Sequence, residues 1–413
     1  MFSLCYFRQV VVIRNDIILL MKNIRLFNFI SYFKELYFYT PIYTLFLLQG
    51  DMSLSILVLA GSIYSIAVFL SEVPTGIFAD IYGQKASLII GYLIEVFSVF
   101  ILIIQPNALT FLILYFIRGV GSSFISGTEE ALIYESAQHT KDKDYKKIYS
   151  RFLSNGQFGF VFATAVAGVT YAYYGKESFV PLILASTFCF FVVSVVSLFL
   201  DDYKVIKFDK SKGSEMFIII KESYKLIKSN RIIKAVVIVG IATLSGEYFI
   251  QDVYQPYFET NNISHFWFGA ALSLGTLLNG LALRRISSLE KKITIPTIIF
   301  WINIILGILY LGLATFISPL FLVGIYITMN GLFDLQQPIL SDYINKETKT
   351  DIRATVLSGA SFLRRLVQIF ITFILAYTLS KHGIQQSLLI QGLYLILGGV
   401  LSYLVLISIK RLK

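Results

Sequence analysis

Charge is scarce in this sequence. Asp, Glu, Lys and Arg make up only 15% of its 413 residues, whereas a soluble protein carries about 25%. Hydrophobic residues account for 56%, and the mean hydropathy is +0.73. This composition offers too few charged groups to cover a water-soluble surface, so the excess apolar residues are expected to lie in lipid.

Cysteine and histidine are also rare, which excludes several kinds of site. Cys5 and Cys189 lie far apart in apolar surroundings, so neither a disulfide framework nor a thiolate metal site is predicted. His139, His265 and His382 fall in predicted loops and form no metal-binding cluster. There is no phosphate-binding loop of the Gly-x-x-x-x-Gly-Lys-Ser/Thr kind and no nucleophile–base pair. We therefore expect no cofactor, no metal and no enzymatic activity.

Apolar stretches long enough to cross a bilayer as helices, about 20 residues each, recur along the whole chain. They predict an all-helical membrane protein with twelve spans, at residues 25–48, 54–79, 86–104, 109–137, 151–174, 178–200, 232–258, 265–283, 293–314, 318–342, 353–379 and 385–408. Glu135 and Asp342 occupy matching positions at the ends of spans 4 and 10, which indicates two related halves.

The longest polar stretch separates the spans into six and six. The expected organisation is an N-terminal extension (1–22), a six-helix bundle (23–200), a cytoplasmic linker with an amphipathic helix (201–231) and a second six-helix bundle (232–413). The two bundles are expected to be related by pseudo-twofold symmetry.

Basic residues are distributed unevenly between the two sides of the membrane. With both termini inside, the outside loops hold only Lys176 and Lys381 of the 35 Lys and Arg residues. The positive-inside rule therefore predicts cytoplasmic termini in a bacterial plasma (inner) membrane. The same distribution accounts for the net charge of +10, so no nucleic-acid partner is expected.

A glycine–acid–glycine turn joins spans 2 and 3. Gly76, Asp80 and Gly83 are followed by Lys85. The glycines permit close approach of two helices, and a carboxylate at the membrane edge can accept hydrogen bonds from the free N–H groups of a helix start. In a chain with twelve spans, this pattern resembles the loop between helices 2 and 3 of the major facilitator superfamily of secondary transporters, although Lys85 alone represents the family's basic residues.

The resemblance implies two six-helix bundles that rock around a central substrate site. In the superfamily, an acid at the inner end of helix 4 pairs with the basic end of the loop motif. This implies that Glu129 or Glu130 pairs with Lys85 as a conformational latch. Two short segments, 126–132 and 351–357, also resemble a bacterial branch of exporters of drugs and other small molecules.

Charged residues also fall inside the predicted spans. Each costs about 2.5 to 3.5 kcal/mol on insertion scales and therefore usually faces a cavity or a partner. Glu35 shares a face of span 1 with Tyr39 and is expected to face a cavity. Lys34 lies on the other side of that helix near the inner edge, where we expect it to snorkel. Arg118, in the middle of span 4, is interpreted either as a buried ion pair with Glu95 or as a counter-charge for a substrate or a proton-carrying acid.

Polar stripes at helical spacing mark three spans of the second half. They comprise Thr243, Glu247, Gln251 and Tyr254 in span 7, Asn330, Asp334, Gln337 and Ser341 in span 10, and Ser358, Ser361, Arg365, Gln368 and Thr372 in span 11. Packing alone does not explain polar groups in register across a membrane helix, so each stripe is expected to line a cavity. Asp252 lies off its stripe. Helices 1, 4, 7 and 10 line the central path in the superfamily, which implies pathway roles for Glu35, Arg118, Glu247 and Asp334.

These features predict a monomeric secondary transporter that exports a small amphipathic or drug-like molecule by proton antiport, as in multidrug efflux. Glu247 or Glu35 is the expected proton carrier, with Glu247 the first choice, because desolvation of a carboxylate favours its protonated form. One alternative is a proton-coupled importer of a nutrient or anionic metabolite, with Arg118 and Arg365 holding the anionic group. Another is a membrane sensor or assembly partner that transports nothing, which the polar stripes disfavour.

Asp80→Asn should slow the transport cycle and leave substrate binding nearly unchanged, because Asp80 lies at a turn beyond the reach of a central cavity. Flux and equilibrium binding, measured on the same reconstituted variant, separate the two effects. Wild-type flux, or lost binding in a folded variant, would contradict the latch role.

Overall fold

The computed structural model describes residues 22–50, 52–138, 145–202, 231–244, 249–290, 292–315, 318–333, 335–336, 339–340 and 350–410. These residues form helices and turns, with no strand among them. The predicted extension, the amphipathic helix of the linker, Glu247 and Asp334 lie outside the described residues.

The helices follow the predicted spans. The first half contains a helix at 22–34, α2 (Tyr43–Leu48), α3 (Leu54–Tyr82), α4 (Gln84–Ile101), η1 (Leu102–Ile104), α5 (Ala108–Gln138), α6 (Tyr145–Tyr174), η2 (Gly175–Ser178) and α7 (Phe179–Ser197). The second half contains α9 (Arg231–Leu244), α10 (Phe249–Thr260), α11 (Phe266–Glu290), α12 (Ile295–Ala314), α13 (Pro319–Leu332) and α15 (Thr350–Lys410).

Seven helical stretches in the described part of the chain are long and apolar enough to cross a membrane. Two of them, Ile148–Ser197 and Leu363–Ser408, contain a reversal of direction, at η2 and at Gly383, which has φ +81°. The fold is therefore an all-helical membrane fold, and the number of twelve spans stays a prediction.

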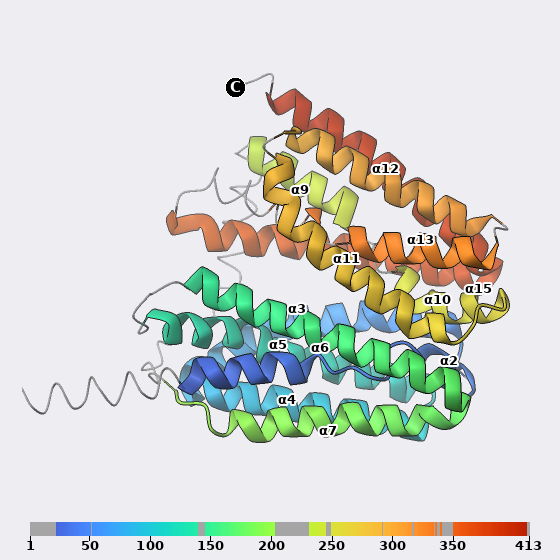
Figure 1. The fold of residues 1–413 in the computed structure, drawn as a ribbon. Coiled ribbons are helices and arrows are strands. Elements are labelled where there is room, and N and C mark those ends of the chain that lie inside the picture. The colour runs from blue at the N-terminus through green and yellow to red at the C-terminus, as the bar shows by residue number, and fades with distance from the viewer. Residues whose placement is uncertain are drawn as a thin grey trace, which may run out of the picture.

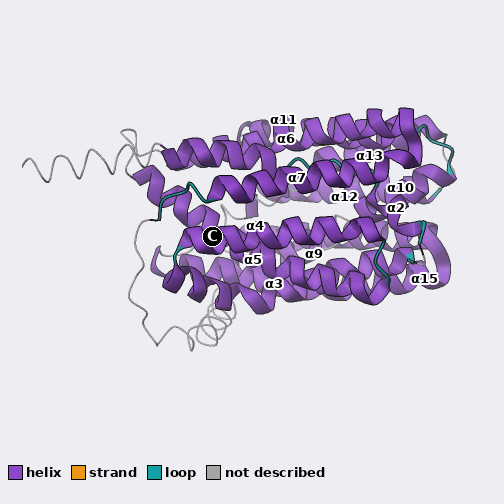
Figure 2. Cartoon of the chain, turned by 90° about the horizontal axis from the view of Figure 1, so that it is seen from below, coloured by secondary structure: helices purple, strands orange, loops and turns teal. Residues whose placement is uncertain are grey.

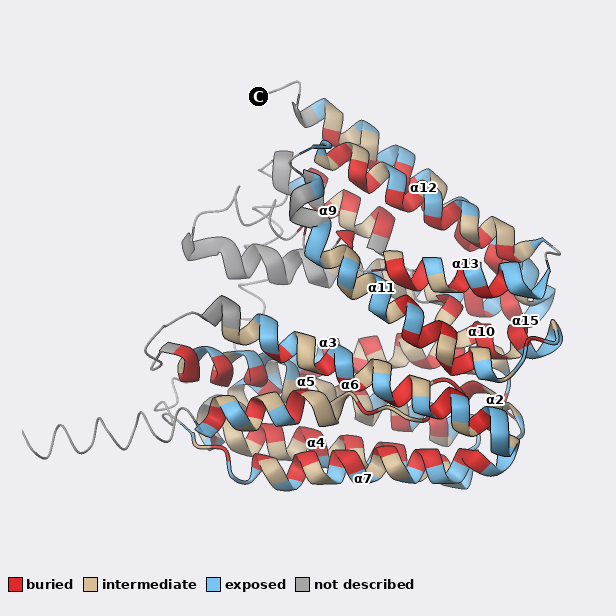
Figure 3. Ribbon diagram, viewed as in Figure 1, coloured by how far each residue is buried: buried red, intermediate tan, exposed pale blue. Residues whose placement is uncertain are grey.

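The helices form two bundles that lie side by side (Figure 1). Their long axes run in roughly the same direction, as the view from below shows (Figure 2). Large apolar side chains such as Phe97, Phe100, Phe188 and Phe191 are exposed on the outside of the first bundle, while buried residues line the helix contacts (Figure 3). An apolar exterior around a packed interior is what a bilayer requires.

The first predicted span is broken, contrary to the expectation of one helix over 25–48. The helix at 22–34 ends just before Glu35, and α2 begins only at Tyr43. Pro41 explains part of the break, because it has no N–H to donate and disfavours a helical conformation at Thr40. Short turns replace the helix, for example from the Ile42 N–H to the Tyr39 carbonyl at 3.0 Å. Irregular backbone is tolerated inside a membrane where it is enclosed by protein or lines a cavity.

The turn between α3 and α4 depends on Gly83, which has φ +99°. A Cβ atom there would also lie 2.2 Å from the Asp202 carboxylate. That carboxylate, at the end of the first half, accepts a hydrogen bond from the Lys85 N–H at 3.0 Å and so caps the start of α4. Among the described residues, no atom lies within 4 Å of a Cβ placed on Gly76, so the close approach expected there stays a prediction. The latch role of Asp80 stays a prediction.

Hydrogen bonds join the two halves at the end that carries α2 and α10, which we call the distal end. Gln255 of α10 is fully buried there. Its Oε1 accepts from the N–H groups of Thr44 at 2.9 Å and Leu45 at 3.3 Å, and its Nε2 donates to the Thr40 carbonyl at 2.8 Å. These N–H groups open α2 and have no partner inside that helix. A side chain of the second half therefore caps a broken helix of the first.

A second contact between the halves joins α6 to α11. The hydroxyl groups of Thr164 and Ser273 lie 2.7 Å apart. Near them, a Cβ atom on Gly168 would lie 2.9 Å from the Gly269 Cα, so the two backbones pack without intervening side chains. Toward the opposite, basic end, which carries Lys22, the two bundles diverge (Figure 1).

Gln255→Ala should shift the protein toward conformations that are open at the distal end. The substitution leaves two N–H groups and one carbonyl without this partner, and each unsatisfied buried group costs about 1–3 kcal/mol. Spin labels at the exposed positions Gln49 and Thr260 report the separation of the halves by pulsed electron resonance.

Gln105→Ala is the matched control for this variant, because the Gln105 amide bonds the Phe46 carbonyl within the first half. It should leave the label distances unchanged. A wild-type distance distribution in Gln255→Ala would show that this cap does not hold the distal end closed.

Candidate functional site

Three adjoining cavities lie along the break in the first helix. The N-half cavity, about 440 Å³, is lined by Lys34, Glu35, Tyr37, Gly61, Tyr64, Tyr92, Glu95, Tyr115, Arg118, Ser122, Ile125, Ser126, Glu129 and Phe190. The distal cavity, about 260 Å³, is lined by Tyr37, Tyr39, Thr40, Tyr43, Tyr115, Arg118, Phe160, Gln251, Asp252, Tyr254, Leu272 and Tyr326. The junction cavity, about 210 Å³, is lined by Glu35, Gln157, Phe160, Gln251, Leu272, Thr276, Asn279, Asn330 and Phe333.

Shared side chains connect these cavities. Arg118 and Tyr115 line both the N-half and the distal cavity. Glu35 lines both the N-half and the junction cavity, and Gln251 lines the junction and the distal cavity. The N-half cavity is lined by residues of the first half, and it adjoins two cavities that are lined by residues of both halves.

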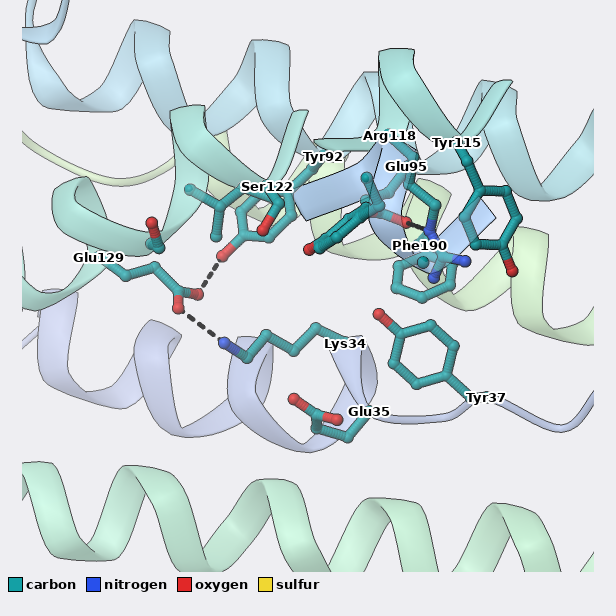
Figure 4. Close-up of a pocket in the computed structure, with 14 residues that line it drawn as sticks. Lys34, Glu35, Tyr37, Tyr92, Glu95, Tyr115, Arg118, Ser122, Glu129 and Phe190 are labelled. Carbon is teal, nitrogen blue, oxygen red and sulfur yellow. Dashed lines mark hydrogen bonds and ion pairs between the residues drawn. The ribbon is translucent and has the colours of Figure 1, made fainter. Parts of the chain in front are cut away.

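Lys34 forms an ion pair across the N-half cavity. Its Nζ lies 2.6 Å from Glu129 Oε2 (Figure 4). The same atom lies 4.7 Å from the centroid of the Phe152 ring. The Tyr92 hydroxyl donates a short hydrogen bond to the other carboxylate oxygen. The expectation that Lys34 snorkels to the membrane edge is therefore wrong. Lys34 is the last residue of the first helix, so it reaches across to α5 instead of following the helix surface outward.

The position of Glu129 also corrects its expected role as a partner of Lys85. Its carboxylate is buried in the cavity, where Lys34 and Tyr92 occupy it. Adjacent helix residues point about 100° apart, so Glu129 and Glu130 cannot both face the cavity. Glu130 is exposed, and its pairing with Lys85 stays a prediction.

Arg118 forms the second ion pair of the site. Its Nε lies 2.9 Å from Glu95 Oε2, which agrees with one of the two interpretations drawn from the sequence. Glycines bring the two helices together, since a Cβ atom on Gly91 of α4 would lie 2.9 Å from the Gly121 carbonyl oxygen of α5. The guanidinium carbon of Arg118 also lies 5.9 Å from the ring centroid of Tyr37 and 5.9 Å from that of Tyr115.

The Glu35 carboxylate has no hydrogen-bond or ion-pair partner within the described residues, although the Glu35 carbonyl accepts a hydrogen bond from the Tyr37 N–H at 2.8 Å. It directly follows the first helix and points into the space below Lys34 and Tyr37 (Figure 4). Gly156 of α6 makes room for it, because a Cβ atom there would lie 3.0 Å from Glu35 Cγ. Both cavity cations are thus paired, and Glu35 is the acid left over in the N-half cavity.

The second half contributes a wall that is mainly neutral in its described part. Gln251 Nε2 lies 3.4 Å from Asn330 Oδ1, so the stripes of spans 7 and 10 meet here. Thr243 is instead fully buried and bonds the Val239 carbonyl. Arg365 is half-buried on α15 and is not among the residues that line the three cavities, so its pathway role stays a prediction.

Asp252 is a site residue that the sequence analysis missed. It lines the distal cavity, and its Oδ1 accepts a hydrogen bond from the Tyr43 hydroxyl at 3.0 Å. We placed it off the polar stripe of span 7, because it lies about 100° around the helix from Gln251. Gln251, Asp252 and Tyr254 of α10 all line the distal cavity, so the cavity extends beyond the stripe.

A model of the Major Facilitator Superfamily matches residues 26–372. An uncharacterized MFS-type transporter of Bacillus subtilis (strain 168), YxaM, is 22% identical over 372 residues, which cover 89% of this chain and 91% of that protein.

Two solved transporter structures have a similar fold. The nucleoside transporter NupG superposes with a TM-score of 0.73 and 15% identity, covering 94% of this chain and 99% of NupG. The POT family transporter PepTSo superposes with a TM-score of 0.71 and 12% identity, covering 95% and 99%. At these identities the likeness concerns the fold alone.

Lys34→Met should destabilise the protein by about 3–5 kcal/mol, because it leaves the Glu129 carboxylate buried without its counter-charge. Thermal unfolding in detergent measures the loss, and the exchange Lys34→Glu with Glu129→Lys should recover part of it. Lys22→Met is the control, since Lys22 pairs with Asp201 at an exposed site and should cost less than about 1 kcal/mol. Equal losses for Lys34→Met and Lys22→Met would show that the cavity pair carries no special weight.

Proposed function

This chain belongs to the major facilitator superfamily, and from that premise we propose that it exports a small amphipathic molecule, cationic or neutral, in exchange for protons. The protein is a membrane-spanning transporter and not an enzyme. One observation supports the finer proposal. Lys34 and Arg118 are each neutralised by an ion pair, while Glu35 faces the cavities without one.

The chemistry of Glu35 suits a coupling site. A carboxylate without a basic partner takes up and releases a proton without first breaking an ion pair. It also lies at the junction of two cavities, directly after the helix that carries Lys34. A change of charge at Glu35 therefore acts on the Lys34–Glu129 pair, which links the first helix to α5.

Antiport follows from the same charge balance. In the described part of the site, the acids outnumber the bases, so either a proton or a cationic group restores neutrality. Because one ligand lowers the attraction for the other, the two are carried in turn and in opposite directions. With the basic end in the cytoplasm, as the distribution of Lys and Arg favours, an inward proton gradient drives the molecule outward.

The halves are in contact at the distal end, which indicates the step of the transport cycle that this conformation represents. Gln255 and the contact between Thr164 and Ser273 hold the halves together there. We propose that these contacts break when the transporter turns outward, so the state described is the one loaded from the cytoplasm.

Ethidium, an amphipathic fluorescent cation, tests the direction of transport. Cells that produce the protein should accumulate less ethidium than control cells, and a protonophore should remove the difference. Greater accumulation in the producing cells would favour the importer instead. A sensor would be favoured if cationic, neutral and anionic probes all crossed proteoliposomes with a pH gradient no faster than they cross liposomes without the protein.

Glu35→Gln should abolish gradient-driven ethidium transport but keep ethidium exchange in the absence of a gradient. Glutamine preserves the shape of the side chain and cannot carry the proton. Proteoliposomes with an imposed pH gradient measure both activities. Glu177→Gln makes the same chemical change at an exposed position of η2 and should leave both intact.

Glu247→Gln belongs in the same series, because the sequence pattern assigned the proton to that residue. If Glu247→Gln uncouples transport while Glu35→Gln concentrates ethidium normally, the proton site lies in the second half. If both variants remain fully coupled, neither carboxylate carries the proton.

A further inference from the structure

The distal cavity combines features that the proton-coupling proposal does not use. Residues of both halves meet in it, and its walls are mostly aromatic: Tyr37, Tyr39, Tyr43, Tyr115, Phe160, Tyr254 and Tyr326. The acid in this cavity is Asp252, which pairs with no Lys or Arg among the described residues. An aromatic chamber with one carboxylate is a chemically specific environment.

We infer that the distal cavity binds an organic ammonium group, with Asp252 as its counter-ion and tyrosine rings as its walls. The inference rests on the proposed function, since it names the chemical class of the molecule that is carried. Alkylated ammonium groups combine a diffuse positive charge with apolar surface, and the faces of aromatic rings attract both.

The carboxylate is positioned for this role by the neighbouring half. Tyr43 of α2 holds Asp252 Oδ1 through one hydrogen bond at 3.0 Å, and the Thr44 hydroxyl bonds the Asp252 carbonyl at 3.3 Å. These contacts fix the side chain and leave the second oxygen without a hydrogen-bond partner in the described structure. That oxygen is available to a cationic ligand.

The rings themselves already hold a cation. The Arg118 guanidinium lies over Tyr37 and Tyr115, both of which also line the distal cavity. Arg118 adds a positive charge to this wall, but Glu95 neutralises it at 2.9 Å. Deeper in the second half, the Tyr254 and Tyr326 rings stack with centroids 4.4 Å apart and present a further aromatic wall.

The same composition argues against a metal ion as the ligand. Calcium takes about 6–8 oxygen ligands, with carboxylates prominent among them. Within the described residues, the distal cavity offers one carboxylate, and no cluster of potential metal ligands is present. A large, weakly hydrated organic cation fits this lining better, because it needs apolar contact more than it needs oxygen donors.

Choline and its neutral isostere 3,3-dimethylbutan-1-ol provide a matched pair of probes. Titration calorimetry on the purified full chain in detergent should show binding of choline and at least tenfold weaker binding of the alcohol. Asp252→Asn should weaken choline binding about tenfold or more, which corresponds to about 1.4 kcal/mol. Equal affinity for the two probes, or wild-type choline affinity in folded Asp252→Asn, would overturn the inference.

Two substitutions of one tyrosine separate the ring from its hydroxyl. Tyr43→Phe keeps the aromatic face and frees Asp252 Oδ1, while the Thr44 hydroxyl still bonds the Asp252 carbonyl, so choline affinity should stay close to that of the wild type. Tyr43→Leu removes the ring, and affinity should fall several-fold. A fall in both variants, with unfolding temperatures near wild type, would show that the hydroxyl rather than the ring matters and would overturn the aromatic part of the inference.

Glu35→Gln distinguishes failure of this inference from failure of the proposed function. It should lose gradient-driven ethidium transport and still bind choline. If the wild-type protein transports ethidium against a gradient but binds no choline, the cation site is wrong and the transport function stands. If choline binds through Asp252 while no variant or condition gives coupled flux, the site stands and the proton-coupled function is wrong.

Discussion

The need to satisfy every backbone polar group inside a membrane governs this structure. The first helix breaks after residue 34, and the break leaves N–H and carbonyl groups that lipid cannot bond. Gln255, on the other half of the protein, bonds three of them. The backbone of the first half is therefore complete only while the second half lies against it, which makes a local helix defect dependent on the conformation of the whole molecule.

The same break produces the asymmetric distribution of charge in the site. Where the helix ends, Lys34 reaches across to Glu129, while the next residue, Glu35, turns into the cavities without a partner. A regular helix would have kept the two side chains on separate faces about 100° apart, along a surface that continues to the membrane edge. One irregular segment thus carries both Lys34, whose charge is held by an ion pair, and Glu35, whose carboxylate has no such partner.

Much of the fold was predictable, because hydrophobic length and loop charge act over about 20 residues and tolerate local error. Gly83 was identified from its place in a motif, and Arg118 was paired with Glu95 as one of two alternatives. The errors concern Lys34, Glu129 and Asp252. Lys34 was placed on a continuous first helix, and its reach across to Glu129 at the break corrects the expectation for both residues. Asp252 was set aside because it lies off its polar stripe, although the distal cavity extends to it. The break in the first helix is stabilised by hydrogen bonds from Gln255 in the other half, and the sequence of the first span does not reveal that partner.

In the rocking motion proposed above, the contact between Gly168 and Gly269 would set the leverage on the α6–α11 side of the interface. Gly168 lies about 9 Å from the distal end of α6 at Tyr174 and about 35 Å from its other end at Tyr145, at 1.5 Å per residue. A rotation of one bundle about this point moves the basic end roughly four times as far as the distal end. In the proposed cycle, the opening on the basic side would then be wider than the opening at the distal end, and large molecules would enter from the basic side more easily than from the distal side.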